Sequence, residues 1–182
     1  DDDDPRASRP GSGGEFTKIG GEIYRLQQIT GPTSVFLRAS GQWANNRVVS
    51  AEQVTVGGIG TVRGYPIGEV AGDHGYATTV EFRWNAPGFS SVPAFMGWTW
   101  GDVLQTFAFV DHGRVQVIDP VEGEKRRAWL TGAGAGLQFL VPDNFFLRVE
   151  YARPIRRLVD GPKPSDGLDN LIYFQAVKFF EF

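Results

Sequence analysis

Apolar and polar side chains alternate along most of the chain with a period of two residues, from Phe16 onward. The alternation is clear in residues 78–84 and 145–151, where apolar or mild side chains share one face and the other face holds Thr79, Glu81, Arg83, Arg148 and Glu150. A period of two is the repeat of a β-strand, whereas no segment has convincing helical spacing. The pattern therefore predicts an all-β protein.

Seven strands are predicted, and most exceed the usual five or six residues of a globular strand. They are residues 16–29, 33–43, 76–86, 100–112, 127–141, 144–155 and 170–182. The connections between them are short and long in turn. This is typical of an antiparallel transmembrane β-barrel, which has short turns on one rim and long loops on the other. A soluble β-sandwich has no reason to sort its connections in this way.

The polar faces of these strands contain residues that are costly to bury in a dry core: Glu81, Arg83, Gln138, Arg148 and Glu150. A water-filled lumen accepts such side chains. The apolar faces are rich in aromatic residues near the strand ends, as expected at the two membrane interfaces. Together these faces favour an antiparallel transmembrane barrel of about seven to eight strands.

The composition narrows the function. The 182 residues suffice for one domain, and the net charge of −3 offers no basic surface for nucleic acid. The absence of cysteine excludes a disulfide, a thiol nucleophile and a zinc–thiolate site within this sequence. We expect no metal and no cofactor. Residues 1–15 are rich in Asp, Gly, Pro and Ser and are expected to form an unstructured head or linker, with the barrel part spanning 16–182.

The long connection 44–75 contains the stretch "GGIGTVRGYPIGEVAGDHGY", residues 57–76, in which a single arginine lies among many glycines. This stretch resembles the two-partner secretion transporters of the haemolysin-activator type, from the superfamily of outer-membrane barrels with POTRA domains. The resemblance rests on an ordered set of motifs. These are Gly57-Gly58, Val62-Arg63-Gly64-Tyr65, Gly72-Asp73-x-Gly75-Tyr76, Phe109-x-Asp111-x-Gly113 and the terminal Phe182.

The resemblance implies that the long loop folds into the barrel and that its arginine meets acidic side chains on the inner wall. Glu81 lies on the polar face of its strand, and Asp111 shares a face with Phe107 and Phe109, so both carboxylates can point inward. We expect Arg63 to act as a latch between them, because a guanidinium forms planar, charge-assisted pairs with carboxylates. The expected latch is Val62, Arg63, Gly64 and Tyr65, and its expected partners on the wall are Glu81, Phe109, Asp111 and Gly113.

The resemblance further implies a bacterial outer-membrane pore that exports a partner exoprotein and is not an enzyme. The aromatic residues Phe180 and Phe182 would form the C-terminal membrane-insertion signal that the barrel-assembly machinery reads. Outer-membrane lipid would surround the barrel. Because the family has sixteen strands and two POTRA domains, we expect this chain to be the C-terminal part of the barrel. A small barrel with an eighth strand, or an assembly of two copies, remains the alternative.

Three other functions remain open. An insertase of the same superfamily would fold other barrels, whereas a diffusion porin or structural barrel would need no latch. A hydrolase is suggested by Asp111 and His112, which resemble the Asp–His pair of outer-membrane barrel proteases. Neighbours on a strand point to opposite faces, however, which argues against a working pair. The run "GAGAGL" at 132–137 matches no dinucleotide fingerprint, since no helix follows it.

Overall fold

Seven long strands form one antiparallel sheet in which each strand pairs with the next long strand along the chain. The computed structural model describes residues 9, 11–12, 14–142, 144–155 and 164–179. The strands of the sheet are β1 (Lys18–Gln28), β2 (Thr33–Ala44), β5 (His74–Asn85), β6 (Leu104–Gln116), β7 (Arg127–Val141), β8 (Phe145–Pro154) and β9 (Leu171–Lys178). The all-β class predicted from the period of two and the antiparallel arrangement predicted from the connection lengths are both confirmed.

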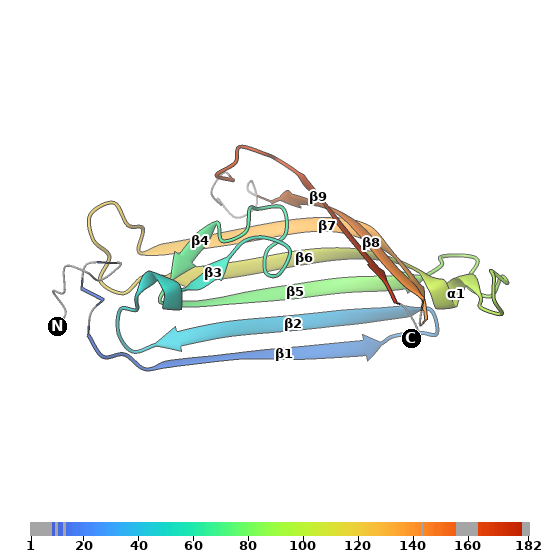
Figure 1. Ribbon diagram of the computed structural model, residues 1–182, viewed down its shortest axis with the longest axis horizontal. Helices are drawn as coiled ribbons and strands as arrows, with labels where there is room; N and C mark the ends of the chain where they lie inside the picture. Colours follow the sequence, from blue (N-terminus) through green and yellow to red (C-terminus); the bar gives the residue numbers. More distant parts are fainter. Residues whose placement is uncertain (1–8, 10, 13, 143, 156–163, 180–182) are drawn as a thin grey trace.

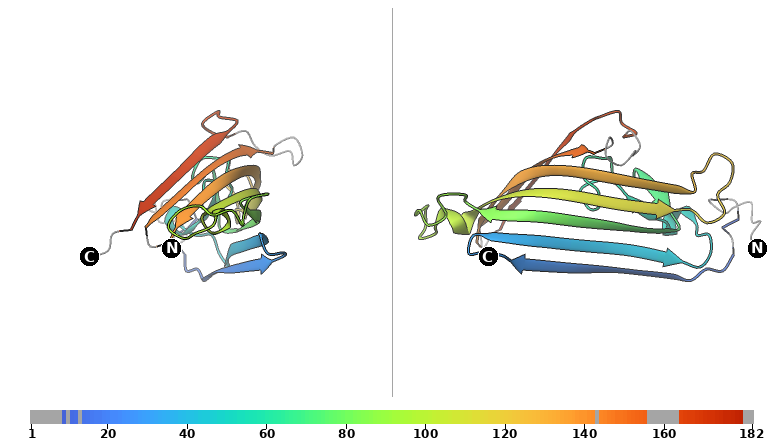
Figure 2. Two further views of the ribbon diagram at one scale, coloured as in Figure 1. Left: turned by 90° about the vertical axis from the view of Figure 1, so that its right-hand side faces the viewer. Right: turned by 180° about the vertical axis from the view of Figure 1, so that it is seen from behind.

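The sheet is strongly curved and open. Seen end-on, it curls from β1 around to β9 and encloses a concave side (Figure 2). Within the described part of the chain, β1 and β9 form the two edges and do not pair with each other. The connection between β2 and β5, residues 45–73, lies against the concave side over β6 and β7 (Figure 1), and we call it the inward loop.

The two faces of the sheet differ as the alternation predicts. On the convex face, apolar side chains such as Val80, Val110 and Leu137 are about half exposed. On the concave face, Phe107 and Phe109 are buried together with the carboxylate of Asp111 on the same strand. The sheet thus presents an apolar outer surface and encloses its charges, which is the reverse of a soluble domain and the arrangement of a membrane barrel.

The connections are sorted between the two rims. Residues 29–32 form a tight turn at one rim, where β7 also ends and β8 begins, and the inward loop and the connection 117–126 lie at the other rim. Residues 86–103, at the rim of the tight turns, end in the single helical turn α1 (Trp100–Val103). Of the helices in the described segments, none has the length and apolar character needed to cross a bilayer.

The strand predicted at 100–112 has wrong bounds, since β6 begins at Leu104 and continues to Gln116. The cause is local, because Thr99 and Asp102 form a capping box that holds residues 100–103 in a helical turn. The strand predicted at 76–86 likewise begins earlier, at His74.

The inward loop has structure of its own. It contains the 3-10 turn η1 (Ser50–Glu52) and a short antiparallel pair, β3 (Val54–Val56) with β4 (Val70–Gly72). Three of its apolar side chains pack against the inner wall and form a small dry core near the rim of the long loops. This core consists of Val56, Val62 and Tyr65 from the loop with Val115 and Leu130 from the wall.

Candidate functional site: a loop arginine on an acidic wall

Arg63 lies at the tip of the inward loop and is 5% exposed. Its guanidinium grips Asp111 on β6 with two hydrogen bonds, from Nε at 2.7 Å and from Nη2 at 2.9 Å. The backbone N–H of Arg63 donates to the same carboxylate at 3.1 Å. Asp111 is fully buried, so this two-pronged pairing is well shielded from water.

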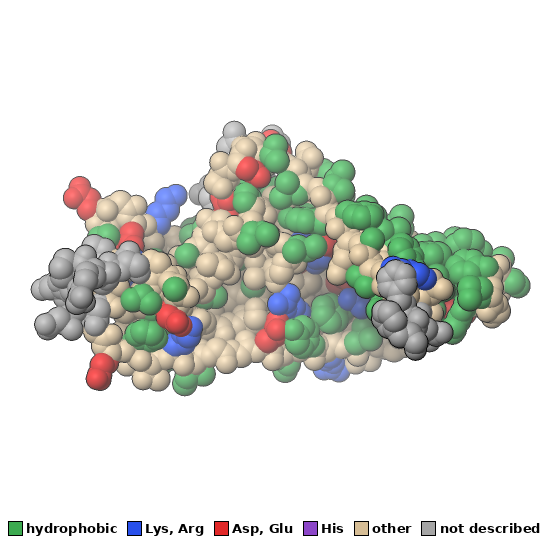
Figure 3. Space-filling view, in the orientation of Figure 1, with side chains coloured by type: hydrophobic (Ala, Val, Ile, Leu, Met, Phe, Trp, Pro, Cys, Tyr) green, Lys and Arg blue, Asp and Glu red, His purple; other side chains and the backbone are tan. Residues whose placement is uncertain are grey.

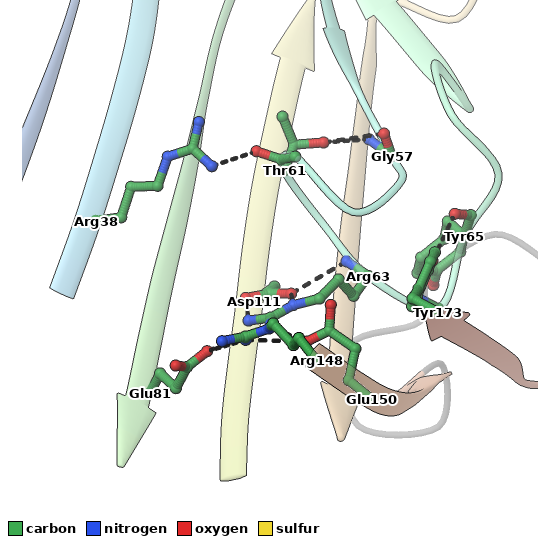
Figure 4. Close-up of polar contacts among 12 residues, drawn as sticks. Arg38, Gly57, Thr61, Arg63, Tyr65, Glu81, Asp111, Arg148, Glu150 and Tyr173 are labelled. Carbon is green, nitrogen blue, oxygen red and sulfur yellow. Dashed lines mark hydrogen bonds and ion pairs between the residues drawn. The ribbon is translucent and has the colours of Figure 1, made fainter. Parts of the chain in front are cut away.

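Two further carboxylates approach the remaining nitrogen of the guanidinium. Nη1 of Arg63 donates to Glu150 on β8 at 2.8 Å and to Glu81 on β5 at 3.3 Å (Figure 4). Three strands therefore each contribute one buried acid to a single loop side chain. A loop that is fixed to three strands at once cannot shift without breaking charge-assisted bonds.

The charges of this cluster are balanced. Arg148 donates to Glu81 at 2.9 Å and to Glu150 at 3.0 Å, and Arg83 donates to Glu81 at 2.8 Å. The network thus pairs three arginines with three carboxylates. Removing one member leaves an uncompensated buried charge, which costs about 3–5 kcal/mol.

Two of these guanidinium groups lie over aromatic rings and form cation–π contacts with them. The Cζ atom of Arg63 lies 3.3 Å from the ring centre of Phe109, and that of Arg148 lies 3.9 Å from the ring centre of Phe107. A cation above an aromatic face gains about 0.5–2 kcal/mol, more when water is excluded. The inward phenylalanines therefore support the arginines directly.

Glycines on β7 make room for the loop tip and the rings. A Cβ atom on Gly132 would lie 1.9 Å from the carbonyl oxygen of Arg63. On Gly134 and Gly136 it would lie 2.6 Å and 2.4 Å from Cζ of the two inward phenylalanines. Gly64 has a φ of +91°, and a Cβ there would meet the β8 backbone at 2.7 Å. The glycines are thus required by close approach.

The residues that flank Arg63 hold the loop tip against the inner wall and against the edge strand β9. Val62 and Tyr65 are fully buried in the dry core. The backbone N–H of Gly64 donates to the hydroxyl of Tyr173 on β9 at 3.1 Å. Gly113, on the inner wall, lies so close to the loop that a Cβ would be 3.1 Å from Val62.

The structure brings the expected latch residues and the expected wall residues into one place. Phe180 and Phe182, the expected insertion signal, lie outside the described residues. The alternation predicts Glu150 and Arg148 as polar residues of an inner face, but it does not predict their part in the network. Both residues lie on the same face of the sheet as Gln138 of the neighbouring strand. This shared polar face indicates that they are internal, but it does not identify the residues that they contact.

A second buried ion pair lies at the rim of the long loops and joins the two ends of the inward loop. Asp73, at its exit, accepts hydrogen bonds from Arg9 at 2.7 Å, from the N–H of Val48 at 3.1 Å and from the N–H of Ile118 at 2.7 Å. Arg9 also donates to Glu124 at 3.2 Å. Arg9 belongs to the head that was expected to be unstructured, yet it is 6% exposed.

The surroundings of Asp73 act on its pKa in opposite directions. Burial raises the pKa of this carboxyl, but the hydrogen bonds from Arg9 and from the two backbone amides outweigh burial, so the pKa lies below its ordinary value. Asp73 therefore stays ionised while the loops are closed around it, and it holds the entry and exit of the inward loop together.

Asp111 and His112 do not form a hydrolytic pair. Asp111 faces the interior, whereas the ring of His112 contacts the hydroxyl of Thr131 at 2.8 Å, with which it shares the outer face. Across the described ranges, no group of three or more His, Cys, Asp or Glu side chains is arranged to hold a metal ion.

A family model covers most of the chain. Residues 2–139 match the haemolysin secretion/activation proteins ShlB/FhaC/HecB. The chain belongs to this family. Its curved sheet is part of an outer-membrane β-barrel.

Curated relatives of the chain are longer proteins. The heme/hemopexin transporter protein HuxB of Haemophilus influenzae strain 86-028NP is 27% identical over 144 residues, which cover 75% of this chain and 24% of that protein. HuxB of another Haemophilus influenzae source is 28% identical over 141 residues, which cover 72% and 23%. The chain thus spans about a quarter of the length of the curated relatives that it matches.

Solved structures share the fold. CdiB from Escherichia coli has a TM-score of 0.66 at 19% identity, with 97% of this chain and 30% of that chain covered. CdiB from Acinetobacter baumannii has a TM-score of 0.61 at 21% identity, covering 88% and 26%. BamA from Haemophilus ducreyi lacking POTRA domains 1–3 has a TM-score of 0.63 at 17% identity, covering 93% and 36%.

Proposed function

We propose that the chain is the C-terminal part of an outer-membrane pore that exports a partner exoprotein and that the inward loop closes this pore at rest. The single observation that supports the proposal is the grip of three strands on Arg63. A loop that occupies the concave side blocks the path of an unfolded chain. A closed state held by ion pairs can open when their partners separate.

The alternative of a diffusion porin explains less. A porin needs an open interior, and a fully paired arginine buried against the wall adds nothing to diffusion. The family match names secretion and activation of haemolysin, and the relatives named above are transporters of heme/hemopexin. We therefore propose a secreted protein as the cargo and assign no catalytic step to the pore.

The outer face and the C-terminal residues supply the remaining partners of the proposal. The apolar convex surface around Val80, Val110 and Leu137 would contact outer-membrane lipid. Phe180 and Phe182 would be read by the barrel-assembly machinery during insertion. We assign the latch role to Val62, Arg63, Gly64 and Tyr65. Their partners on the wall are Asp111, Glu81 and Phe109, and Gly113 leaves the space that the loop occupies.

The test compares Arg63→Ala with Arg126→Ala, which removes an exposed arginine of the connection 117–126, in the full-length protein. Resting conductance is measured in planar bilayers, and export of the partner protein is measured in cells. We expect Arg63→Ala to raise the resting conductance and to alter export, while Arg126→Ala resembles wild type. Conductance and export that both stay at the wild-type level in Arg63→Ala would refute the latch and favour a porin.

A further inference from the structure

The connection between β5 and β6 is unusually apolar for a segment at the end of a barrel. Residues 86–101, "APGFSSVPAFMGWTWG", contain no charged side chain. Several of their large apolar side chains are exposed, with Met96 at 74% and Val92 at 46%. The space-filling view shows an apolar surface that covers this end of the molecule around α1 (Figure 3). Exposed patches of this kind mark interaction surfaces.

Backbone hydrogen bonds within this segment fix the position of its apolar tip. Pro93 and Thr99 form an isolated antiparallel bridge. Inside it, the N–H of Ala94 donates to the carbonyl of Trp98, and the N–H of Trp98 donates to the carbonyl of Phe95, both at 2.9 Å. The segment is therefore a small hairpin that presents Met96 at its turn, and it is built to keep that side chain exposed.

The hairpin lies on the outer side of the barrel wall. The ring of Phe95 packs against the ring of Phe139 on β7 at 5.9 Å and against Trp100 at 6.5 Å. Phe139 pairs with Leu104 and has the same strand parity as the exposed Leu137, so it belongs to the convex face. The apolar surface of the hairpin is thus continuous with the apolar outer face.

We propose that residues 86–101, which we call the rim hairpin, insert into the interfacial zone of the lipid leaflet at the rim of the tight turns. The inference rests on the proposed contact between the convex face and lipid. Phe and Trp side chains are typical of the boundary between headgroups and acyl chains, and no charged side chain in this segment opposes their insertion. A protein-binding surface normally has a polar rim around its apolar centre, and this segment offers only small hydroxyl residues.

The test uses single cysteines, which is practical because the 182 residues contain none. In the full-length protein, with any cysteine elsewhere replaced by serine, Met96→Cys, Val80→Cys and Val121→Cys are each labelled with a small environment-sensitive fluorophore. Val80 lies mid-strand on the convex face, and Val121 lies in the connection at the opposite rim. The proteins are reconstituted into vesicles whose lipids have a nitroxide either near the headgroup or near the acyl-chain end.

We expect nitroxides near the headgroup to quench the label at Met96 about twofold or more, given an interfacial depth of roughly 5–10 Å. The label at Val80 should respond more to the deep nitroxide, and the label at Val121 to neither. If Val80 is quenched and Met96 is not, the rim hairpin is not in lipid although the barrel is. If neither is quenched, the proposed lipid contact itself fails. Blue-shifted emission at Met96 without quenching means that protein covers it and overturns the inference.

Discussion

Neutralising Asp111 is the sharpest test of how the inward loop is held. Asp111→Asn keeps the size of the side chain but removes its charge and turns one acceptor into a donor that faces the N–H groups of Arg63. Three hydrogen bonds to Arg63 depend on this carboxylate. Because Arg63 then lacks its principal partner in a buried site, we expect undocking to become easier by about 3–5 kcal/mol.

The chain supplies its own reporter for undocking. Trypsin cuts after arginine, and the bond between Arg63 and Gly64 is protected while the guanidinium is buried. When opening and closing are faster than cutting, the cleavage rate follows the open population. A change of 3–5 kcal/mol corresponds to an increase of about two to four orders of magnitude in that population. The fragment that ends at Arg63 is quantified over time by mass spectrometry on the purified full-length protein.

The control is Glu122→Gln, which neutralises an exposed carboxylate of the connection 117–126 that is absent from the network. It should cleave at the wild-type rate. If Asp111→Asn also cleaves after Arg63 at the wild-type rate, the pairing does not hold the loop, and the reasoning from buried charge is wrong for this site.

Two further predictions concern packing and pH. Gly132→Ala should expose Arg63 to trypsin, because the new Cβ would lie 1.9 Å from the carbonyl oxygen of Arg63. The control Gly31→Ala, with open space around its Cβ, should be cleaved at the wild-type rate. Equal cleavage rates in the two variants would contradict the close approach. The ionised carboxylate of Asp73 stabilises the closed loops at pH values above its ordinary pKa of 3.8. This stabilisation is lost as the pH falls through the lowered pKa. The melting temperature should therefore exceed that of Asp73→Asn by a constant amount from about pH 7 to about pH 4 and converge with it only at lower pH. Convergence near neutral pH would contradict this assignment.

The alternation of side chains predicted which residues are internal, because the face of a strand residue is a local property. Glu81 and Asp111 point inward for this reason. That Glu150 completes the site depends on the register of β8 against β7, where it stands opposite Gly136, and no local pattern specifies that register. The burial of Arg9 depends on loops that are distant in sequence and only meet in the folded rim.

The hydrogen bond between Gly64 and Tyr173 joins the loop tip to the edge strand of the sheet. Tyr173 lies on β9, whose other long edge has no partner among the described residues. Any force that withdraws the tip therefore also removes an inner brace from the last strand. In the proposed pore, opening of the passage by withdrawal of the loop tip would therefore also loosen the edge strand, because both depend on the hydroxyl of Tyr173.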